Sequence, residues 1–406
     1  MDSQLAAASR ALASGDALAA LNYIALRDDP PSLALRGIAM AQLNDLDRAR
    51  KLLRRAARGF GPRETIARAR CLVAEAEIAL VLRDLTWPPQ RLDSAVAALQ
   101  RGGDRANAAH AGYLAIRRLV LIGRLDEAEQ RMQSFDSAPL AAASRVAYHL
   151  VAAGVATRRL HAAAARDWLR QAESVARQTR IASLIAEVED AARRLELPAA
   201  RLIASGRERL LLLDDVEALL ASNALVIDAR RLAVRSAAIT VPLATRPVLL
   251  ILARVLAEAW PDAASREALL ARAFRARRAD ESHRARLRVE IGRLRKALAG
   301  LAGVRATQIG FALVPCRDCE VAVLAPPTEE PHADVLALLA DGEAWSSSAL
   351  ALALGVSART IQRALDGLVA AGKAQPLGRG RARRWMAPPS PGFPTSLLLP
   401  VAPQAG

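Results

Sequence analysis

Clustered Lys and Arg side chains are the residues of this sequence whose types and spacing could do chemistry. Residues 266–305 carry twelve of them against four Asp and Glu, and residues 359–384 carry seven against one acid. The whole chain has a net charge of +16, whereas residues 1–200 contain 29 basic and 22 acidic residues, an excess of only seven. Positive charge concentrated in two windows is expected of surfaces that bind phosphate groups.

The two basic windows contain the candidate residues for contact with double-stranded DNA. In the first window, Leu287, Ile291 and Leu294 recur at helical spacing, which predicts a helix at 282–299 with one buried stripe. Arginines border both sides of this stripe, which suits a helix that packs on one face and contacts DNA with the other. The candidate DNA-binding residues are Arg284, Arg286, Arg288, Arg293, Arg295, Lys296 and Arg305 in the first window, and Arg359, Thr360, Gln362, Arg363, Arg379, Arg381, Arg383 and Arg384 in the second.

The second window belongs to a helix-turn-helix pattern, centred on the stretch GVSARTIQRAL. Gly355 is expected to supply a turn with positive φ, Val356 to fill the core, and Ser357 to cap the helix that follows. The second helix of such a motif can lie in the major groove of DNA. With the basic segment after it, the pattern predicts a small winged helix at 332–387. Its helices are expected at 333–340, 347–354 and 358–371, and its extended basic segment at 373–385.

The elements that must position the first window lie in residues 224–315. Apolar and polar residues alternate at 224–243, which predicts a small β-meander. Three helical runs follow, and residues 304–315 form an extended piece. The helical runs are expected at 246–260, 265–274 and 282–299.

Four motifs in this region resemble, in the same order, those of the OmpR/PhoB-type winged-helix effector domain of response regulators. The matching segments are LATR (243–246), SREALL (265–270), LRVEIGRLRKAL (287–298) and GFAL (310–313). They are similar to the family's L-T-x-R/x-E, S-R-E-x-L-L, V-x-V-H-I-x-R-L-R-x-K-L and G-Y-R-L. The resemblance spans residues 224–315 and implies a winged helix-turn-helix domain that binds DNA.

The same resemblance implies roles for individual residues. Arg293 and Arg295 occupy the family's base-contacting arginine positions. The usual arginine of the wing aligns with Thr307, so a minor-groove contact by the wing would depend on Arg305. Glu290 stands where a His is common, and its charge is poorly placed beside phosphates. The first half of the chain lacks the alternating βα pattern of a receiver domain, so phosphorylation of an aspartate on this chain is not the expected signal.

The pattern of apolar and polar residues in 1–204 predicts successive amphipathic helices, and a short motif recurs in them. The small residue that ends the motif recurs at spacings of 46, 33 and 35 residues. Spacing near 34 is the period of tetratricopeptide repeats, in which small residues let paired helices approach closely. This half resembles a degenerate tetratricopeptide-type solenoid, with an irregular helical bundle as the alternative. The four copies are Leu46–Ala49, Leu92–Ala95, Leu125–Ala128 and Leu160–Ala163.

Composition bounds the class of protein. The chain is 52% hydrophobic but only 3% aromatic, and rich in Ala, Leu and Arg, which predicts a mostly α-helical protein. The N-terminus is a poor signal peptide and no apolar run is long enough to span a bilayer, so a cytoplasmic location without a membrane partner is expected. Cys71, Cys316 and Cys319 are too few for a disulfide framework. The segment from Cys316 to Cys319 is expected to form an interdomain turn. The alternative is that these two cysteines bind a metal ion or sense the redox state.

Motifs of enzyme active sites are missing from the sequence. It has no GxxxxGK[ST] phosphate loop, no GxGxxG after a strand, no HExxH and no GxSxG. His110, His149 and His161 lie singly in Ala-rich helical patterns and are expected to be packing or surface residues. The sequence therefore predicts no catalytic residues, no metal site and no cofactor.

These observations predict a bacterial DNA-binding transcriptional regulator. The expected domains are a helical-repeat sensor or partner domain (1–204), an OmpR/PhoB-like winged helix (215–315), a linker (316–331), a second winged helix-turn-helix (332–387) and a Pro-rich tail (388–406). The expected partners are double-stranded DNA, a protein or small ligand on the helical repeats, RNA polymerase and a second copy of the chain. The alternatives are a protein-interaction scaffold whose winged helices bind proteins, and a replication or plasmid initiator.

Overall fold

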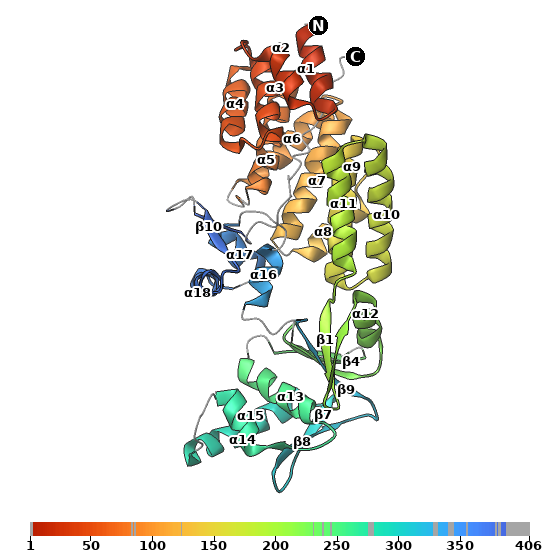
Figure 1. Ribbon diagram of the computed structural model, residues 1–406, viewed down its shortest axis with the longest axis vertical. Coiled ribbons are helices and arrows are strands. Elements are labelled where there is room, and N and C mark those ends of the chain that lie inside the picture. The colour runs from red at the N-terminus through yellow and green to blue at the C-terminus, as the bar shows by residue number, and fades with distance from the viewer. Residues whose placement is uncertain are drawn as a thin grey trace. The chain divides into compact units, whose positions relative to one another are not determined.

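The protein is mostly helical, and an N-terminal run of paired helices precedes a mixed α/β region with small sheets (Figure 1). This confirms the predicted predominance of helix. Contacts divide the chain into two compact units, one of Met1–Ala156, Ala164–Ala192 and Pro331–Gly406, the other of Thr157–Ala163 and Arg193–Glu330. The structure, a computed structural model, describes residues 3–82, 84, 87–122, 124–229, 231–237, 239–243, 246–274, 280–327, 332–339, 345–354, 356–377, 380 and 383–386.

The N-terminal helices begin where aspartates can cap them. Asp16, Asp29, Asp45 and Asp104 each accept a hydrogen bond of 2.9–3.3 Å from the backbone N–H three residues on, a group that the first helical turn leaves unpaired. The helices are α1 (Ser3–Ala13), α2 (Ala17–Ile24), α3 (Pro30–Gln42), α4 (Leu46–Gly59), α5 (Thr65–Val81), α6 (Pro89–Arg101), α7 (Arg105–Leu121), α8 (Leu125–Gln133), α9 (Ala142–Arg159), α10 (Ala162–Thr179) and α11 (Ala182–Leu195).

Small residues of the recurring motif lie where these helices touch. Ala49, Ala95 and Ala128 are buried, and a Cβ added to Gly37 of α3 would lie 2.8 Å from Leu53 Cγ of α4. The fourth copy differs, because α10 begins at Ala162 and buries that residue, while Ala163 faces solvent. Close helix–helix approach is therefore supported in the first three copies of the motif.

The second unit is built on two small sheets. The larger sheet has the strand order β2-β1-β9-β3-β4-β5, and the smaller one the order β6-β8-β7. The predicted meander at 224–243 is formed by β3, β4 and β5, which pair antiparallel in sequence. The strands are β1 (Ala200–Ala204), β2 (Arg207–Leu211), β3 (Leu225–Asp228), β4 (Ala233–Ser236), β5 (Ile239–Pro242), β6 (Ala264–Ser265), β7 (Ala302–Ala306), β8 (Gly310–Pro315) and β9 (Val321–Ala325); the helices are α12 (Leu213–Ala221), α13 (Pro247–Ala259), α14 (Arg266–Phe274) and α15 (Glu281–Ala297).

Strand β9 lies inside the segment 316–331, which the sequence predicts as a linker. It pairs antiparallel with β1 and parallel with β3, and every residue of it is buried. Val321 and Val323 pack into the same apolar cluster as α13, whereas Leu324 packs on the opposite side against α12. Residues 321–325 are all apolar because both faces of β9 are buried. This part of the expected linker therefore belongs to the core of the second unit.

Helices α13, α14 and α15 pack against the smaller sheet, β6-β8-β7, and share a core with it. Leu252 of α13, Leu269 of α14 and Ile291 of α15 are almost completely buried in one cluster with Val304 and Phe311 of the hairpin β7–β8. In this cluster the stripe of α15 is held on one side, which leaves its other sides free for contacts with solvent or a ligand.

A substitution at Gly310 tests how closely strand β8 of the hairpin β7–β8 approaches β6. A Cβ at this position would lie 1.9 Å from the carbonyl oxygen of Ala264, a distance that no backbone adjustment of a paired strand absorbs cheaply. We expect Gly310→Ala to lower the free energy of unfolding by at least about 1–3 kcal/mol. Urea unfolding followed by circular dichroism measures this, with Gly292→Ala as the control, since nothing lies within 4 Å of its added Cβ. Equal stability of the two variants would contradict the close approach of β6 and β8.

The C-terminal part of the first unit consists of three helices and a two-stranded sheet. Ser357 caps α18 as predicted, since its Oγ accepts a hydrogen bond of 3.1 Å from the Thr360 N–H. The prediction that Val356 fills the core is wrong, because its side chain is 41% exposed; Trp345 and Trp385 are fully buried instead. Gly355 lies outside the described residues. The elements are α16 (Ala333–Leu339), α17 (Ser347–Leu354), α18 (Ala358–Ala370), β10 (Gln375–Leu377) and β11 (Arg384–Met386).

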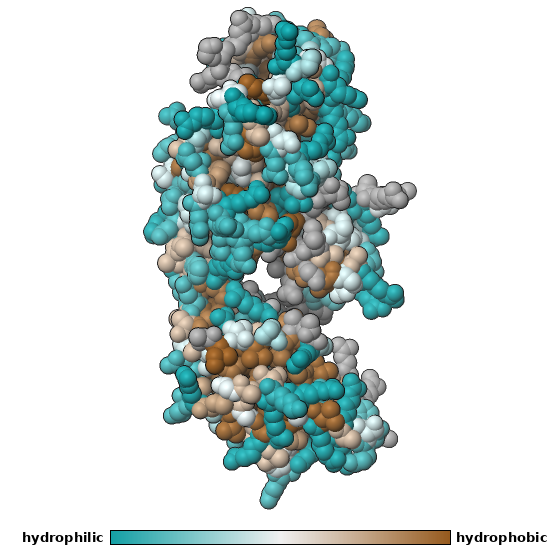
Figure 2. All heavy atoms as spheres, turned by 180° about the vertical axis from the view of Figure 1, so that it is seen from behind, coloured by the Kyte–Doolittle hydropathy of each residue, from teal (hydrophilic) through white to brown (hydrophobic). Residues whose placement is uncertain are grey.

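On the face shown in Figure 2, hydrophilic residues predominate in the upper part, and apolar residues gather most densely in the lower part. None of the described helices has both the length and the apolar character that crossing a bilayer requires.

Candidate nucleic-acid interface

Helix α15 positions most of the predicted basic residues of the first window. Asp280 caps it by accepting a hydrogen bond of 2.8 Å from the His283 N–H, and hydrogen bonds from the backbone and the ring of His283 lower the pKa of this carboxyl. Leu287, Ile291 and Leu294 are at most 2% exposed. The cap and the stripe together fix where the helix starts and which side it buries.

All seven predicted residues of the first window are exposed, and the structure brings them to one helix and the strand after it. Several are held by neighbours. The contacts are Arg284 and Arg288 to the Glu281 carboxylate at 3.5 and 3.4 Å, Arg286 over the Phe274 ring at 4.7 Å, Arg293 to Glu290 at 2.8 Å, and Arg295 Nε to the Val304 carbonyl oxygen at 2.7 Å. Among the described residues, Arg286, Arg295, Lys296 and Arg305 have no acidic partner, and Lys296 and Arg305 have no contact of these kinds at all.

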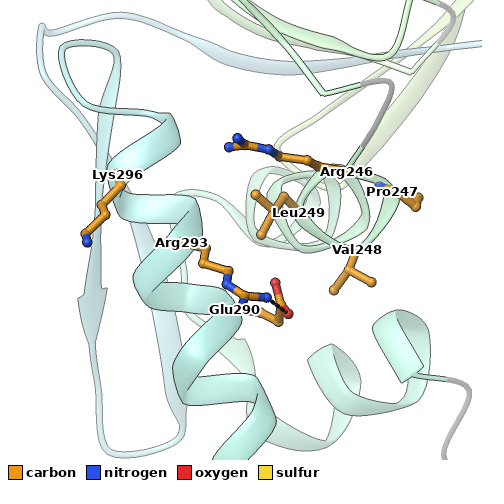
Figure 3. A pocket seen from close by; sticks show the side chains of 7 residues that line it. All are labelled: Arg246, Pro247, Val248, Leu249, Glu290, Arg293 and Lys296. Atoms are coloured by element: carbon orange, nitrogen blue, oxygen red, sulfur yellow. Dashed lines mark hydrogen bonds and ion pairs between the residues drawn. The ribbon is translucent and has the colours of Figure 1, made fainter.

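Glu290 has a different environment from the one expected at the sequence level. Its side chain is only 12% exposed and forms an ion pair with Arg293, whose side chain is 64% exposed. The carboxylate is therefore shielded by its own arginine and does not face solvent as a free negative charge. The same ion pair holds Arg293 against the flank of α15 that faces α13 (Figure 3).

A pocket of about 450 Å³ lies between the start of α13 and α15 (Figure 3). Three of its side chains are cationic and one is acidic. Pro247 at the first helical position has no N–H, and the N–H groups of Leu249 and Leu250 donate to the Arg246 carbonyl oxygen at 3.0 and 3.2 Å. Among the described residues, Val248 therefore supplies the N–H of this first turn that has no partner. Such a helix start with cations around it suits an oxyanion. The lining residues are Arg246, Pro247, Val248, Leu249, Glu290, Arg293 and Lys296.

The predicted residues of the second window lie on α18 and on the sheet after it. Arg359, Thr360 and Arg363 are exposed at one end of α18, and Gln362 is half-buried. The Gln362 amide donates to Asp366 at 2.8 Å, and the Thr360 hydroxyl is within 2.8 Å of the Ser357 hydroxyl. Two of these four side chains thus already have partners within the helix.

The basic segment after α18 is described only in part. Arg383 lies over the Trp385 ring at 4.2 Å, and Arg384 is half-buried, with its guanidinium donating to the Arg383 carbonyl at 3.1 Å. Arg379 and Arg381 lie outside the described residues. The candidates of the second window belong to the first compact unit, and those of the first window to the second.

Two arginines that the candidate set omits also lie beside these elements. Arg246 lines the pocket at the start of α13. Arg266 donates to the carbonyl oxygens of Gln308 and Thr307 at 2.6 and 3.1 Å, so it holds the turn between β7 and β8. The signal for Arg246 was its place directly before a proline that starts a helix. Arg266 lies in the SREALL segment and in the first basic window, but local spacing does not indicate its role, because its partners are far along the chain.

A buried polar cluster joins three helices of the N-terminal half. His110 Nδ1 lies 3.0 Å from Ser144 Oγ, and its Nε2 lies 3.1 Å from Glu77 Oε2. The three residues are at most 3% exposed. A serine, a histidine and a carboxylate in this order can do acid–base chemistry only where substrate reaches them, and neither described pocket includes them. Their role here is to satisfy one another inside the core.

The three cysteines could serve as metal ligands or as reactive thiols, but the described residues around them form no metal site. Within the described residues, no group of three or more His, Cys, Asp or Glu is arranged to hold a metal ion. All three cysteines are free; Cys316 is exposed and Cys319 half-buried. Burial raises the pKa of the Cys71 thiol to about 12, which keeps it protonated and unreactive at neutral pH.

Comparison with known proteins places the chain beside none of them: no family model matches it, and neither does any curated protein or solved structure.

Proposed function

We propose that this protein is a sequence-specific DNA-binding transcriptional regulator. In this proposal residues 224–315 and 332–387 act as two winged helix-turn-helix domains, and the tetratricopeptide-like N-terminal half responds to a ligand or a protein. The observation that carries the proposal is helix α15, on which a fully buried apolar stripe is bordered by exposed cations. A helix held by one side and cationic at its edges has the form of a helix that enters the major groove.

The outermost side of α15 supports this use. Opposite the buried stripe, the helical spacing places Ala285, Val289 and Gly292 in one row, and Val289 is 54% exposed. Small and apolar side chains allow the helix to lie close to base edges, where they can contact thymine methyl groups. The arginines on both flanks would then meet the phosphates on either side of the groove.

The contacts of individual arginines refine their proposed roles. The Nε–H of Arg295 donates to the Val304 carbonyl oxygen, so the two terminal guanidinium nitrogens of Arg295 remain available to contact a base. Arg293 is bound to Glu290, so base contact by Arg293 requires that ion pair to open. A backbone phosphate in the pocket beside Arg246 and Lys296 would anchor the domain on the duplex. RNA polymerase and a second copy of the chain are the other proposed partners. The proposed location is the cytoplasm of a bacterium.

Two substitutions test the proposal on the full chain. On a duplex selected from random sequences, Arg295→Ala should cost about 1–3 kcal/mol and relax specificity at one position, as expected of a base contact. Lys296→Ala should weaken selected and random duplexes alike, as expected of a phosphate contact. Fluorescence anisotropy measures both, with Arg207→Ala on the exposed strand β2 as the control. No binding of the unmodified chain to any duplex would favour the protein-interaction scaffold.

A further inference from the structure

The helical half carries a second strongly basic pocket, remote in sequence from the candidate DNA-binding residues. It is a hollow of about 570 Å³ formed by α4, α5 and α6. Five of its lining side chains are cationic and one is acidic, which gives the lining a net charge of +4. The lining residues are Lys51, Arg54, Ala57, Arg58, Arg68, Leu72, Glu75 and Arg91.

Helical spacing explains why these cations converge. Lys51, Arg54 and Arg58 are three and four residues apart, so they lie on one face of α4 over two turns. Arg68 and Leu72 are likewise one turn apart on α5. All four cations are exposed, although α4 turns its apolar residues into the core. The hollow thus has a cationic wall on α4 and a mixed cationic and apolar wall on α5.

A buried carboxylate fixes one of the cations in place. The Glu75 side chain is only 4% exposed, and Arg54 binds its Oε1 through Nε at 2.8 Å and through Nη2 at 2.7 Å. Because one carboxylate oxygen takes both bonds, the Arg54 guanidinium is held at the edge of the hollow while its side chain stays 53% exposed. A cation oriented in advance loses little entropy when it binds an anion.

The other four cations keep donor groups free for a ligand. Within the described residues, Lys51 and Arg68 form no ion pair. In the part of the chain that the structure describes, Arg58 uses its Nε alone, which donates to the Arg54 carbonyl oxygen at 3.3 Å, and Arg91 lies over the Trp87 ring at 5.9 Å. Like charges gathered this closely repel one another, so an anion that neutralises them would stabilise the helices around the hollow.

We infer that this hollow binds a small organic polyphosphate. Guanidinium groups bind phosphate oxygens through paired hydrogen bonds, and a triphosphate concentrates roughly three to four negative charges in one short chain, which matches the net charge of the lining. The side chains of Ala57 and Leu72 offer an apolar surface for the organic part. The volume lies in the range of small-molecule sites, about 300–1,000 Å³. In the proposed regulator this ligand would be the signal, and only that regulatory role rests on the proposed function.

Calorimetric titration of the full chain with ATP and with inorganic triphosphate, without DNA and without magnesium, tests the inference. Both should bind, and inorganic phosphate more weakly, because one phosphate meets fewer of the cations. Arg68→Ala and Lys51→Ala should each weaken triphosphate binding about 10-fold or more, since each removes charge-assisted hydrogen bonds. Arg55→Ala should leave binding unchanged, because Arg55 is exposed on the same helix but pairs with Asp28 at 3.2 Å and does not line the hollow.

The contrary outcomes are distinct from failure of DNA binding. Triphosphate binding that survives both Arg68→Ala and Lys51→Ala but is lost in Lys296→Ala would place the anion in the pocket beside α13 and overturn the inference. Absence of any triphosphate binding would overturn it too, whatever the chain does with DNA. If Arg68→Ala weakened duplex binding as much as triphosphate binding, the hollow would belong to a nucleic-acid surface and not to a small ligand. Unchanged circular dichroism of each variant excludes misfolding as the cause.

Discussion

Raising the salt concentration from about 50 to about 200 mM should weaken binding of the full chain to duplex DNA by roughly 10³-fold. The reason is counterion release: if about six phosphates are neutralised, the logarithm of the binding constant falls with the logarithm of salt at a slope of about −5. The two windows supply ample charge for this, because they contain nineteen basic and five acidic residues. Anisotropy titrations at a series of salt concentrations give the slope directly.

Variants make the salt experiment specific to α15. Lys296→Ala should reduce the steepness of the slope by about one, as loss of one phosphate contact does, whereas Arg207→Ala on β2 should leave it unchanged. Arg293→Ala should change the slope less than Lys296→Ala does, because the ion pair with Glu290 already neutralises part of the Arg293 charge. Binding that is insensitive to salt over this range would contradict a phosphate-binding surface altogether.

Replacing Trp385 with alanine should unfold the C-terminal module of helices α16–α18 and strands β10–β11. The indole is fully buried, its Nε1 donates to Ser347 Oγ at 3.0 Å, and the backbones of Trp385 and Trp345 exchange two hydrogen bonds of 2.7 Å. Truncating a buried tryptophan costs about 3–5 kcal/mol, which is a large part of the stability of so small a module.

Hydrogen exchange of the α18 amides measures this loss locally. Trp385→Ala should remove their protection, Trp385→Phe should retain much of it, and Leu377→Ala, at a side chain that is 43% exposed, should have little effect. The same loss should free Arg383 from the indole ring it covers. Protection of α18 that is unchanged in Trp385→Ala would show that the tryptophan pair does not hold the module together.

The candidate site could be predicted from the sequence where its causes are local. The helix expected at 282–299 is observed at Glu281–Ala297, since its cap and its apolar stripe act within a few turns. The cap at Ser357 was predictable for the same reason. By contrast, Val356 is exposed, whereas Trp345 and Trp385 are fully buried in the apolar cluster that includes α18. Trp385 comes from a strand that the helical spacing does not specify.

By itself, the sequence determined that the protein is mostly helical, where its charge is concentrated, and which side of α15 is buried, because composition and helical periodicity act over short distances. Only the tertiary structure decided that residues 321–325 form a central strand, since β9 needs β1 and β3 as partners and both come about a hundred residues earlier. The pocket beside α13, the buried contact of His110 with Glu77 and Ser144, and the basic hollow on α4–α6 have the same origin. Each of these three sites joins side chains from separate helices, and the spacing of residues within one helix does not indicate which other helices it will contact.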